Sequence, residues 1–157
     1  MKSAKLIQEQ LDRKIALIRN LKDVAAPPEG WVYSIRQGIN MSLRQLGRRL
    51  SITPQSVREI EERERTGSIS LKVLNQVASA LDMHFVYGFI PRDGSLEKMV
   101  EKRAAEMSKL IVERTSIQMK LEDQEISRDR LRKAISEKTE QLTRDLPKYL
   151  WDQTPDI

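Results

Sequence analysis

The stretch from Met41 to Glu62 constrains the fold most, because it reads as two short helices joined by a tight turn. Ser42 is followed three residues later by Gln45, the pattern of a capping box that starts a helix. Thr53 predicts a second N-cap, and Pro54 follows at the first helical position, where a missing N–H costs nothing. Apolar residues recur at helical spacing after each cap: Leu43, Leu46 and Leu50, then Val57 and Ile60.

The two predicted helices meet across a two-residue turn, and Gly47 lets their backbones approach closely, as a helix-turn-helix crossing requires. With Val57 and Ile60 turned inward, the start of the second helix presents four polar side chains outward: Gln55, Ser56, Arg58 and Glu59.

These four side chains are suited to reading bases in the major groove. Glutamine can bond adenine, arginine can bond guanine, glutamate can accept from cytosine, and serine can take either role. A helix that carries them at its N-terminal end is typical of a recognition helix. We expect Arg44, with the N–H groups that follow Ser42 and Thr53, to contact phosphates. The alternative is that the arginines of this region merely solvate the surface, and we expect this of at least two of Arg44, Arg48, Arg49, Arg63 and Arg65.

From about Trp31 to Leu81 the chain resembles the phage-repressor-like (Xre/Cro) helix-turn-helix family. The resemblance rests on these residues: Met41-Ser42-Leu43, Leu46-Gly47, Leu50, Thr53-Pro54-Gln55-Ser56 and Ile60-Glu61. It implies a structural ion pair between Arg36 and Glu61; the alternative is two solvated charges. Two positions depart from the family pattern. Ser51 stands where the turn usually has glycine, so a non-glycine residue is expected near the left-handed region. No glycine follows Glu61, so the helix either runs longer or enters a charged loop.

The positive charge is concentrated in the first part of the chain. The net charge is +5; residues 1–65 hold 13 Lys and Arg against 8 Asp and Glu, whereas the remainder holds 15 of each. This distribution supports contact with DNA phosphates at one end. Cysteine is absent, no apolar run approaches a membrane span, and the polar start is no signal peptide, so we expect a cytoplasmic protein with no membrane partner.

Residues 3–24 repeat apolar side chains at helical spacing and predict an N-terminal helix (domain 1–26). Residues 25–30, with two prolines and a glycine, predict a linker to the DNA-binding domain at 31–82. Either intramolecular packing or a partner covers the apolar face of the N-terminal helix. In the DNA-binding domain, 31–38 predicts the first helix, Asn40 a left-handed C-terminal residue, and 70–81 the last helix.

Residues 83–91 predict a strand, because aromatic and β-branched residues gather there and a proline ends them. A lone strand leaves both edges unpaired, so we expect it to pair with its own copy through Phe85, Val86, Tyr87 and Phe89. The resulting homodimer suits a pseudo-palindromic double-stranded operator. The alternative is an extended segment packed on the core.

Residues 95–157 predict a helical hairpin with a break at 122–125 and two aromatics, Tyr149 and Trp151, docked at its end. The first of its helices carries a heptad-like seam that includes Arg103 and Arg114. The expected fold class is therefore all-α with one short strand: a repressor-like helix-turn-helix bundle, an N-terminal helix and a C-terminal helical hairpin.

The layout of the whole chain also looks like the family called mobile mystery protein A. The residues that carry this likeness are Gly30-Trp31, the S-L-R-Q-L stretch at 42–46, Ile90-Pro91-Arg92, Leu121-Glu122-Asp123-Gln124 and Leu150-Trp151-Asp152. The resemblance implies the antitoxin-like, DNA-binding member of a pair with a Fic-domain toxin. The helix motif [S/T]-x-x-x-E-[G/N], by which Fic antitoxins inhibit their partners, is absent from the sequence.

The inventory of reactive residues argues against an enzyme. His84 is the only histidine, cysteine is absent, and there is no glycine-rich phosphate loop. Neighbouring carboxylates such as Glu61 and Glu62 lie in charged helical runs, where solvation is the ordinary explanation. We therefore expect no catalytic residue, no metal site and no cofactor. The competing function is an interaction protein that uses the helix-turn-helix as a scaffold and neutralises a partner toxin by direct binding.

Overall fold

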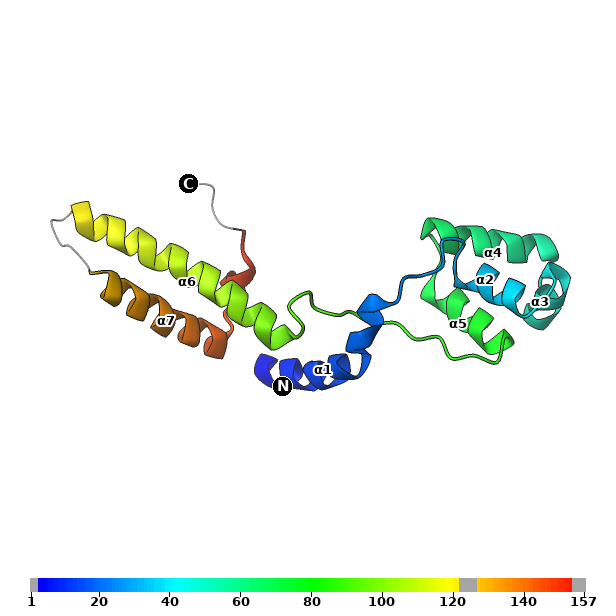
Figure 1. Cartoon of the computed structure of the whole chain (residues 1–157), viewed down its shortest axis with the longest axis horizontal. Coiled ribbons are helices and arrows are strands. Elements are labelled where there is room, and N and C mark those ends of the chain that lie inside the picture. Colours follow the sequence, from blue (N-terminus) through cyan, green and yellow to red (C-terminus); the bar gives the residue numbers. More distant parts are fainter. Residues whose placement is uncertain (1–2, 122–126, 154–157) are drawn as a thin grey trace. The chain divides into compact units, whose positions relative to one another are not determined.

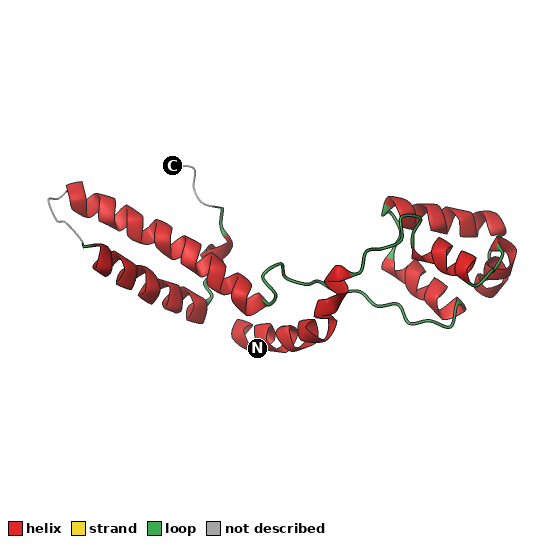
Figure 2. Cartoon of the chain, in the orientation of Figure 1, coloured by secondary structure: helices red, strands yellow, loops and turns green. Residues whose placement is uncertain are grey.

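The computed structural model describes residues 3–121 and 127–153, and all regular structure in this part is helical (Figure 2). The elements in chain order are α1 (Ala4–Ile18), η1 (Arg19–Asp23), α2 (Trp31–Gly38), α3 (Leu43–Leu50), α4 (Pro54–Thr66), α5 (Leu71–Ala80), α6 (Leu96–Leu121), α7 (Arg128–Asp145) and η2 (Lys148–Trp151). None of the described helices is long and apolar enough to cross a bilayer.

Residues Leu21–Gly88 form one compact unit, which contains α2 to α5 (Figure 1). Each of its helices contributes to a single apolar cluster: Val32, Leu46, Val57 and Val77, joined by Leu81 at the end of α5. These are the positions at which the helical period places apolar residues inward. The second helix of the crossing continues to Thr66 and ends at Gly67, whose φ is 82°. After Glu61 the helix therefore runs longer, as the first of the two sequence-based alternatives predicted, and does not enter a charged loop.

The strand predicted at residues 83–91 is wrong for the single chain. After α5 the described backbone is extended, but no neighbouring strand pairs with it. The composition of this segment favours a β conformation, whereas a strand also requires a hydrogen-bonded neighbour, which the single chain does not supply.

The second compact unit combines residues 1–20 with residues 89–157. Helices α6 and α7 lie side by side in it (Figure 1), and Val100, Ala104 and Leu142 from these helices form a core with Leu150 of η2. Helix α1 packs against α6, and Asp12 accepts hydrogen bonds from the N–H groups of Leu96 (2.7 Å) and Glu97 (3.1 Å). The N-terminal helix thus caps a helix that lies more than 80 residues later. It keeps an outer apolar face: Leu6, Ile7, Leu11 and Leu17 are exposed.

At the end of the second unit, Leu150 is docked in place of the two aromatic residues that the sequence analysis expected to dock. Leu150 is fully buried, whereas Tyr149 and Trp151 on either side remain about half exposed. Arg103 donates from Nε to the Leu150 carbonyl (2.6 Å) and from a terminal nitrogen to the Asp152 carbonyl (2.5 Å). This explains a charged residue in the apolar seam of α6, since its guanidinium holds the C-terminal turn. The predicted break at residues 122–125 lies outside the described residues.

Candidate nucleic-acid interface

The turn between α3 and α4 is organised by caps at both helix starts. The Ser42 hydroxyl accepts from the Gln45 N–H (3.1 Å), and the Gln45 side chain accepts from the Ser42 N–H (2.8 Å). The Thr53 hydroxyl accepts from the Ser56 N–H (3.1 Å), with Pro54 in the first turn. The predicted capping box and second N-cap are both confirmed.

The close approach of the two helices depends on Gly47. A Cβ at this position would lie 2.7 Å from the Ile52 carbonyl oxygen, closer than side-chain carbons come to backbone. Ser51 takes the left-handed conformation with φ 58° and ψ 40°, as the missing turn glycine predicted. A non-glycine residue there costs roughly 1 kcal/mol, which the rest of the turn must offset.

Arg36 and Glu61 form a buried ion pair that joins α2 to α4. Arg36 Nε lies 2.5 Å from Glu61 Oε1, a terminal nitrogen lies 3.2 Å from Oε2, and another donates to the Met41 carbonyl (3.0 Å). The side chains are only 8% and 9% exposed. Arg36 also lies over the Tyr33 ring, 5.5 Å from its centroid. Because the guanidinium and the carboxylate are buried and hydrogen-bonded to each other, and the guanidinium also to the Met41 carbonyl, the pair fixes the orientation of α4 relative to α2.

The face of α4 that points away from the core carries polar side chains. Val57 on the inner face is fully buried. Three of the four predicted base-reading residues are exposed: Gln55, Arg58 and Glu59. Ser56 is half-buried, and its hydroxyl lies 2.9 Å from the Thr53 hydroxyl. The structure therefore leaves three long polar side chains free to reach a ligand, while Ser56 also takes part in the helix cap.

Two hollows flank this face of α4, and the residues predicted to contact DNA are divided between them. The first, with a volume of about 770 Å³, adjoins Ser42, Arg44 and Arg58. It brings two predicted phosphate contacts beside one predicted base contact. The second, of about 430 Å³, lies toward α5 and adjoins Ser56 and Glu59. The exposed ridge of α4 between the hollows is the surface that the sequence analysis predicts to contact DNA.

A contact at the rim of the first hollow modifies its charge. Arg65 is ion-paired with Glu62 one turn earlier on α4, with Nε 3.0 Å from Oε2. The hydrogen bond from Arg65 lowers the pKa of Glu62 below its ordinary value, and the same bond raises the pKa of Arg65. Both groups stay charged at neutral pH, so this pair adds no net positive charge to the face.

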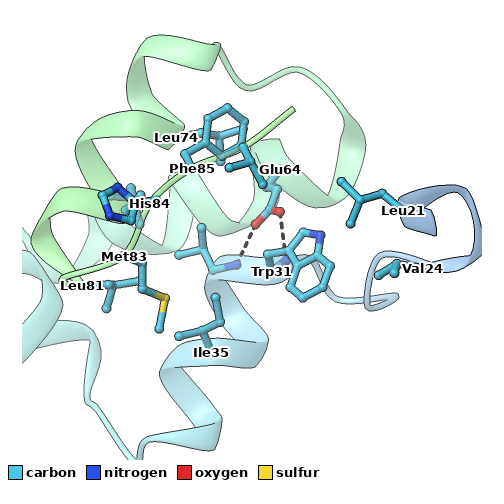
Figure 3. A pocket seen from close by; sticks show the side chains of 14 residues that line it. Leu21, Val24, Trp31, Ile35, Glu64, Leu74, Leu81, Met83, His84 and Phe85 are labelled. Atoms are coloured by element: carbon cyan, nitrogen blue, oxygen red, sulfur yellow. Dashed lines mark hydrogen bonds between the residues drawn. The ribbon is translucent and has the colours of Figure 1, made fainter. Parts of the chain in front are cut away.

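The sequence analysis missed the role of Glu64. Its carboxylate accepts from the N–H groups of Trp31 and Val32, each at 2.8 Å (Figure 3). The residue before α2 is Gly30, which has no side chain with which to cap the helix. The missing side chain at Gly30 indicates that another residue must cap α2, although nothing in the sequence shows which distant residue does so. Glu64 therefore ties the C-terminal half of α4 to the start of α2.

The comparisons with known proteins locate one family within the chain. Residues 32–87 match the model of a family described as Helix-turn-helix, which corresponds to the Xre/Cro-like type. These residues include the α3–α4 crossing, both caps and the buried ion pair. Neither the curated proteins nor the solved structures gave a match.

Proposed function

We propose that this chain is a sequence-specific regulator of transcription that binds double-stranded DNA through α4. The match of residues 32–87 to a DNA-binding domain family supports DNA binding. The observation that carries the sequence specificity is the outward exposure of Gln55, Arg58 and Glu59 at the N-terminal half of α4. Each of these side chains pairs with a different base edge.

The proposed division of labour follows from position. Arg44 is exposed beside Ser42 at the start of α3, where the N–H groups of the first turn favour an anion. These residues therefore bind phosphates of the DNA backbone and so fix the orientation of the protein on the duplex. Thr53 does the same at the start of α4. Gln55, Ser56, Arg58 and Glu59 read base edges.

We expect Gln55→Ala and Arg58→Ala each to weaken binding to the cognate operator by about 1–3 kcal/mol and to relax one base position. Arg44→Ala should weaken binding to operator and random DNA alike and reduce the salt slope by about 1. The measurement is fluorescence anisotropy with DNA from the protein's own promoter and with a random duplex, at several salt concentrations.

Arg132→Ala is the matched control, because Arg132 is exposed on α7 in the other unit. It removes the same charge and should change neither affinity nor salt slope. Equal losses on operator and random DNA for Gln55→Ala and Arg58→Ala would exclude base reading by α4.

The finer proposal is that the chain is an antitoxin-like repressor whose partner is a Fic-domain toxin. Its support is the resemblance of the sequence to mobile mystery protein A. Co-expression of the chain with a Fic-domain protein, followed by affinity capture, tests this pairing. Failure to recover the Fic protein at equal expression would remove the antitoxin role and leave DNA binding untouched.

A second candidate function is direct neutralisation of a partner protein, with DNA binding secondary. Two observations favour it: residues 66–157 are charge-neutral, and α1 keeps four exposed apolar side chains outside its own unit's core. Absence of retardation of promoter DNA at low salt, together with tight capture of the partner, would select this function.

A further inference from the structure

A groove of about 460 Å³ lies entirely within the Leu21–Gly88 unit (Figure 3). Its walls come from the linker before α2, the first turns of α2, the second half of α5, residues 83–86, and one residue of α4, Glu64. Its floor includes Val32, Val77 and Leu81, which are buried in the core cluster of the unit. Concave sites of roughly 300–1,000 Å³ are typical of pockets for small molecules. None of the residues predicted to contact DNA lines this groove.

Apolar side chains around the floor of the groove are left in contact with water. Trp31 at the start of α2 is 46% exposed, and Val24 and Val86 are 54% and 69% exposed. Of the 14 residues that line the groove, all but Glu64 and His84 are apolar. Moving such surface out of water is favourable in proportion to the area covered. The groove therefore selects a ligand with an apolar body.

Glu64 is the only Asp, Glu, Lys or Arg among the lining residues. Its two oxygens accept one hydrogen bond each, from the N–H groups of Trp31 and Val32, both at 2.8 Å. A carboxylate has about four acceptor positions, so each oxygen keeps a lone pair for a further donor. Gly30 makes room for this carboxylate, because a Cβ there would lie 2.9 Å from Glu64 Oε1. The fold thus holds one negative charge at the edge of an apolar groove.

The Trp31 side chain lies next to the Glu64 carboxylate (Figure 3). The face of an indole ring attracts a cation, and a carboxylate binds an ammonium group through a charge-assisted hydrogen bond. A carboxylate or phosphate on the ligand would instead be repelled by Glu64. The charge of the groove therefore favours a cationic ligand over an anionic one.

We propose that this groove binds a small molecule with an aromatic or aliphatic body and one protonated amine. The body covers the apolar floor, and the ammonium group donates to Glu64 beside the Trp31 ring. The extended segment of a second copy matches this charge less well, since residues 83–91 contain no Lys or Arg. The site goes beyond the proposed function, because it assigns a ligand to a surface that is separate from the predicted DNA contacts.

Three probes test the site on the full-length chain with Trp151→Phe, which leaves Trp31 as the only tryptophan. Phenylbutylamine carries the ring and the cation, phenylbutyrate carries the ring and an anion, and butylamine carries the cation without the ring. We expect phenylbutylamine to shift Trp31 emission to shorter wavelength with a Kd on the order of 1 mM or lower. The other two probes should bind at least tenfold more weakly. Equal affinities of phenylbutylamine and phenylbutyrate, or no saturable shift with phenylbutylamine, would overturn the proposal.

Glu64→Gln tests the charge, because the amide oxygen can still cap α2 while the negative charge is lost. It should weaken phenylbutylamine binding at least tenfold and leave phenylbutyrate binding no weaker than before. Glu62→Gln is the matched control, since Glu62 lies on the same helix outside the groove and its replacement should change neither affinity. Unchanged binding of phenylbutylamine to Glu64→Gln would refute the assigned contact.

Ala78→Leu tests the apolar floor without touching the α2 cap. Ala78 lines the groove, so a larger side chain should narrow it and weaken phenylbutylamine binding at least fivefold. Ser79→Leu is the control, because Ser79 is the exposed neighbour on α5 outside the groove. Circular dichroism establishes that each variant is folded. Equal affinities of the two variants would contradict the site.

The concentration of the protein separates the small molecule from a second copy as the occupant. If a second copy filled the groove, the apparent Kd of phenylbutylamine would rise with protein concentration over a roughly 100-fold range. Such a rise would overturn the proposal, and a constant Kd is the expected result. Because no readout involves DNA, a failure of DNA binding leaves this test unaffected.

Discussion

At the scale of single residues, the close approach of α3 and α4 depends on a position that has no room for a Cβ atom. Gly47 has no room for a Cβ, because the Ile52 carbonyl oxygen would lie 2.7 Å from it. Gly38, at the end of α2, has no atom within 4 Å of the place where its Cβ would be. The two glycines therefore separate the effect of crowding from the effect of helix propensity.

Gly47→Ala should destabilise the Leu21–Gly88 unit by about 1–3 kcal/mol, because the backbones must separate or the turn must shift. Gly38→Ala is the matched control, and it should be neutral or stabilise by up to about 1 kcal/mol. Urea unfolding monitored by Trp31 fluorescence in a Trp151→Phe background measures both. Equal effects of the two substitutions would show that the turn accommodates a methyl group.

The Glu62–Arg65 pair makes a pH-dependent contribution whose sign follows from its pKa shift. Arg65 lowers the pKa of Glu62 in the folded state, so the pair stabilises the fold above the pKa that Glu62 has when unfolded. This contribution is lost as pH falls through the lower, folded-state pKa. The unfolding free energies of the unmodified chain and Glu62→Gln should therefore differ most near neutral pH and converge in strong acid.

The size of this difference should be small, since both side chains are about half exposed. Urea unfolding at a series of pH values measures it, and Glu59→Gln on the same helix controls for loss of a carboxylate. A difference that grows toward acid would contradict the assignment.

At the scale of elements, two contacts from the C-terminal half of α4 hold it against the two ends of α2. The Arg36–Glu61 pair joins it to the end of α2, and Glu64 caps the start of α2. Because both contacts originate on α4, the direction of its exposed ridge depends on α2. Helix α2 therefore orients the candidate base-reading residues although it carries none of them.

Glu64→Ala should cost about 0.5–2 kcal/mol of stability, the usual value of a lost N-cap. Promoter DNA should also bind more weakly, because α4 loses one of its two anchors. Glu62→Ala removes a carboxylate two residues before Glu64 on the same helix; it is the control and should leave the α2 cap intact. Hydrogen exchange of the Trp31 and Val32 amides reports the cap itself. Unchanged protection of these amides in Glu64→Ala would contradict the role assigned to the carboxylate.

At the scale of the whole molecule, the chain returns to its first helix after passing through the Leu21–Gly88 unit. Asp12 on α1 caps α6, so the two ends of the chain build one unit and residues 21–88 form the other. Each unit has its own core cluster. Two units with separate cores are expected to respond separately to local substitutions.

Asp12→Ala should destabilise the unit that contains α6 by about 1 kcal/mol and leave the other unit unchanged. The two tryptophans report the units individually, since Trp31 lies in one and Trp151 in the other. Thermal unfolding of Trp31→Phe and Trp151→Phe proteins, each with and without Asp12→Ala, provides the comparison. An equal shift of both signals would show that the units unfold as one.

The sequence by itself determined the local features of the α3–α4 crossing. The caps at Ser42 and Thr53, the need for Gly47, the left-handed turn at Ser51 and the inward stripe through Val57 all follow from neighbours within a few residues. Caps, turns and helix faces of this kind depend on residues that are close to one another in the sequence. The Arg36–Glu61 pair also came from sequence, through the resemblance to a known family and not through spacing.

Only the tertiary structure decided the contacts between distant positions. Glu64 of α4, Asp12 of α1 and Arg103 of α6 bind backbone groups far along the chain, at the start of α2, at the start of α6 and at residues 150–152. Any of many charged residues would have fitted the sequence pattern equally well. The strand expected at 83–91 is absent for a related reason: β propensity is local, but a strand forms only with a hydrogen-bonded partner, and residues 3–121 and 127–153 of the single chain provide none.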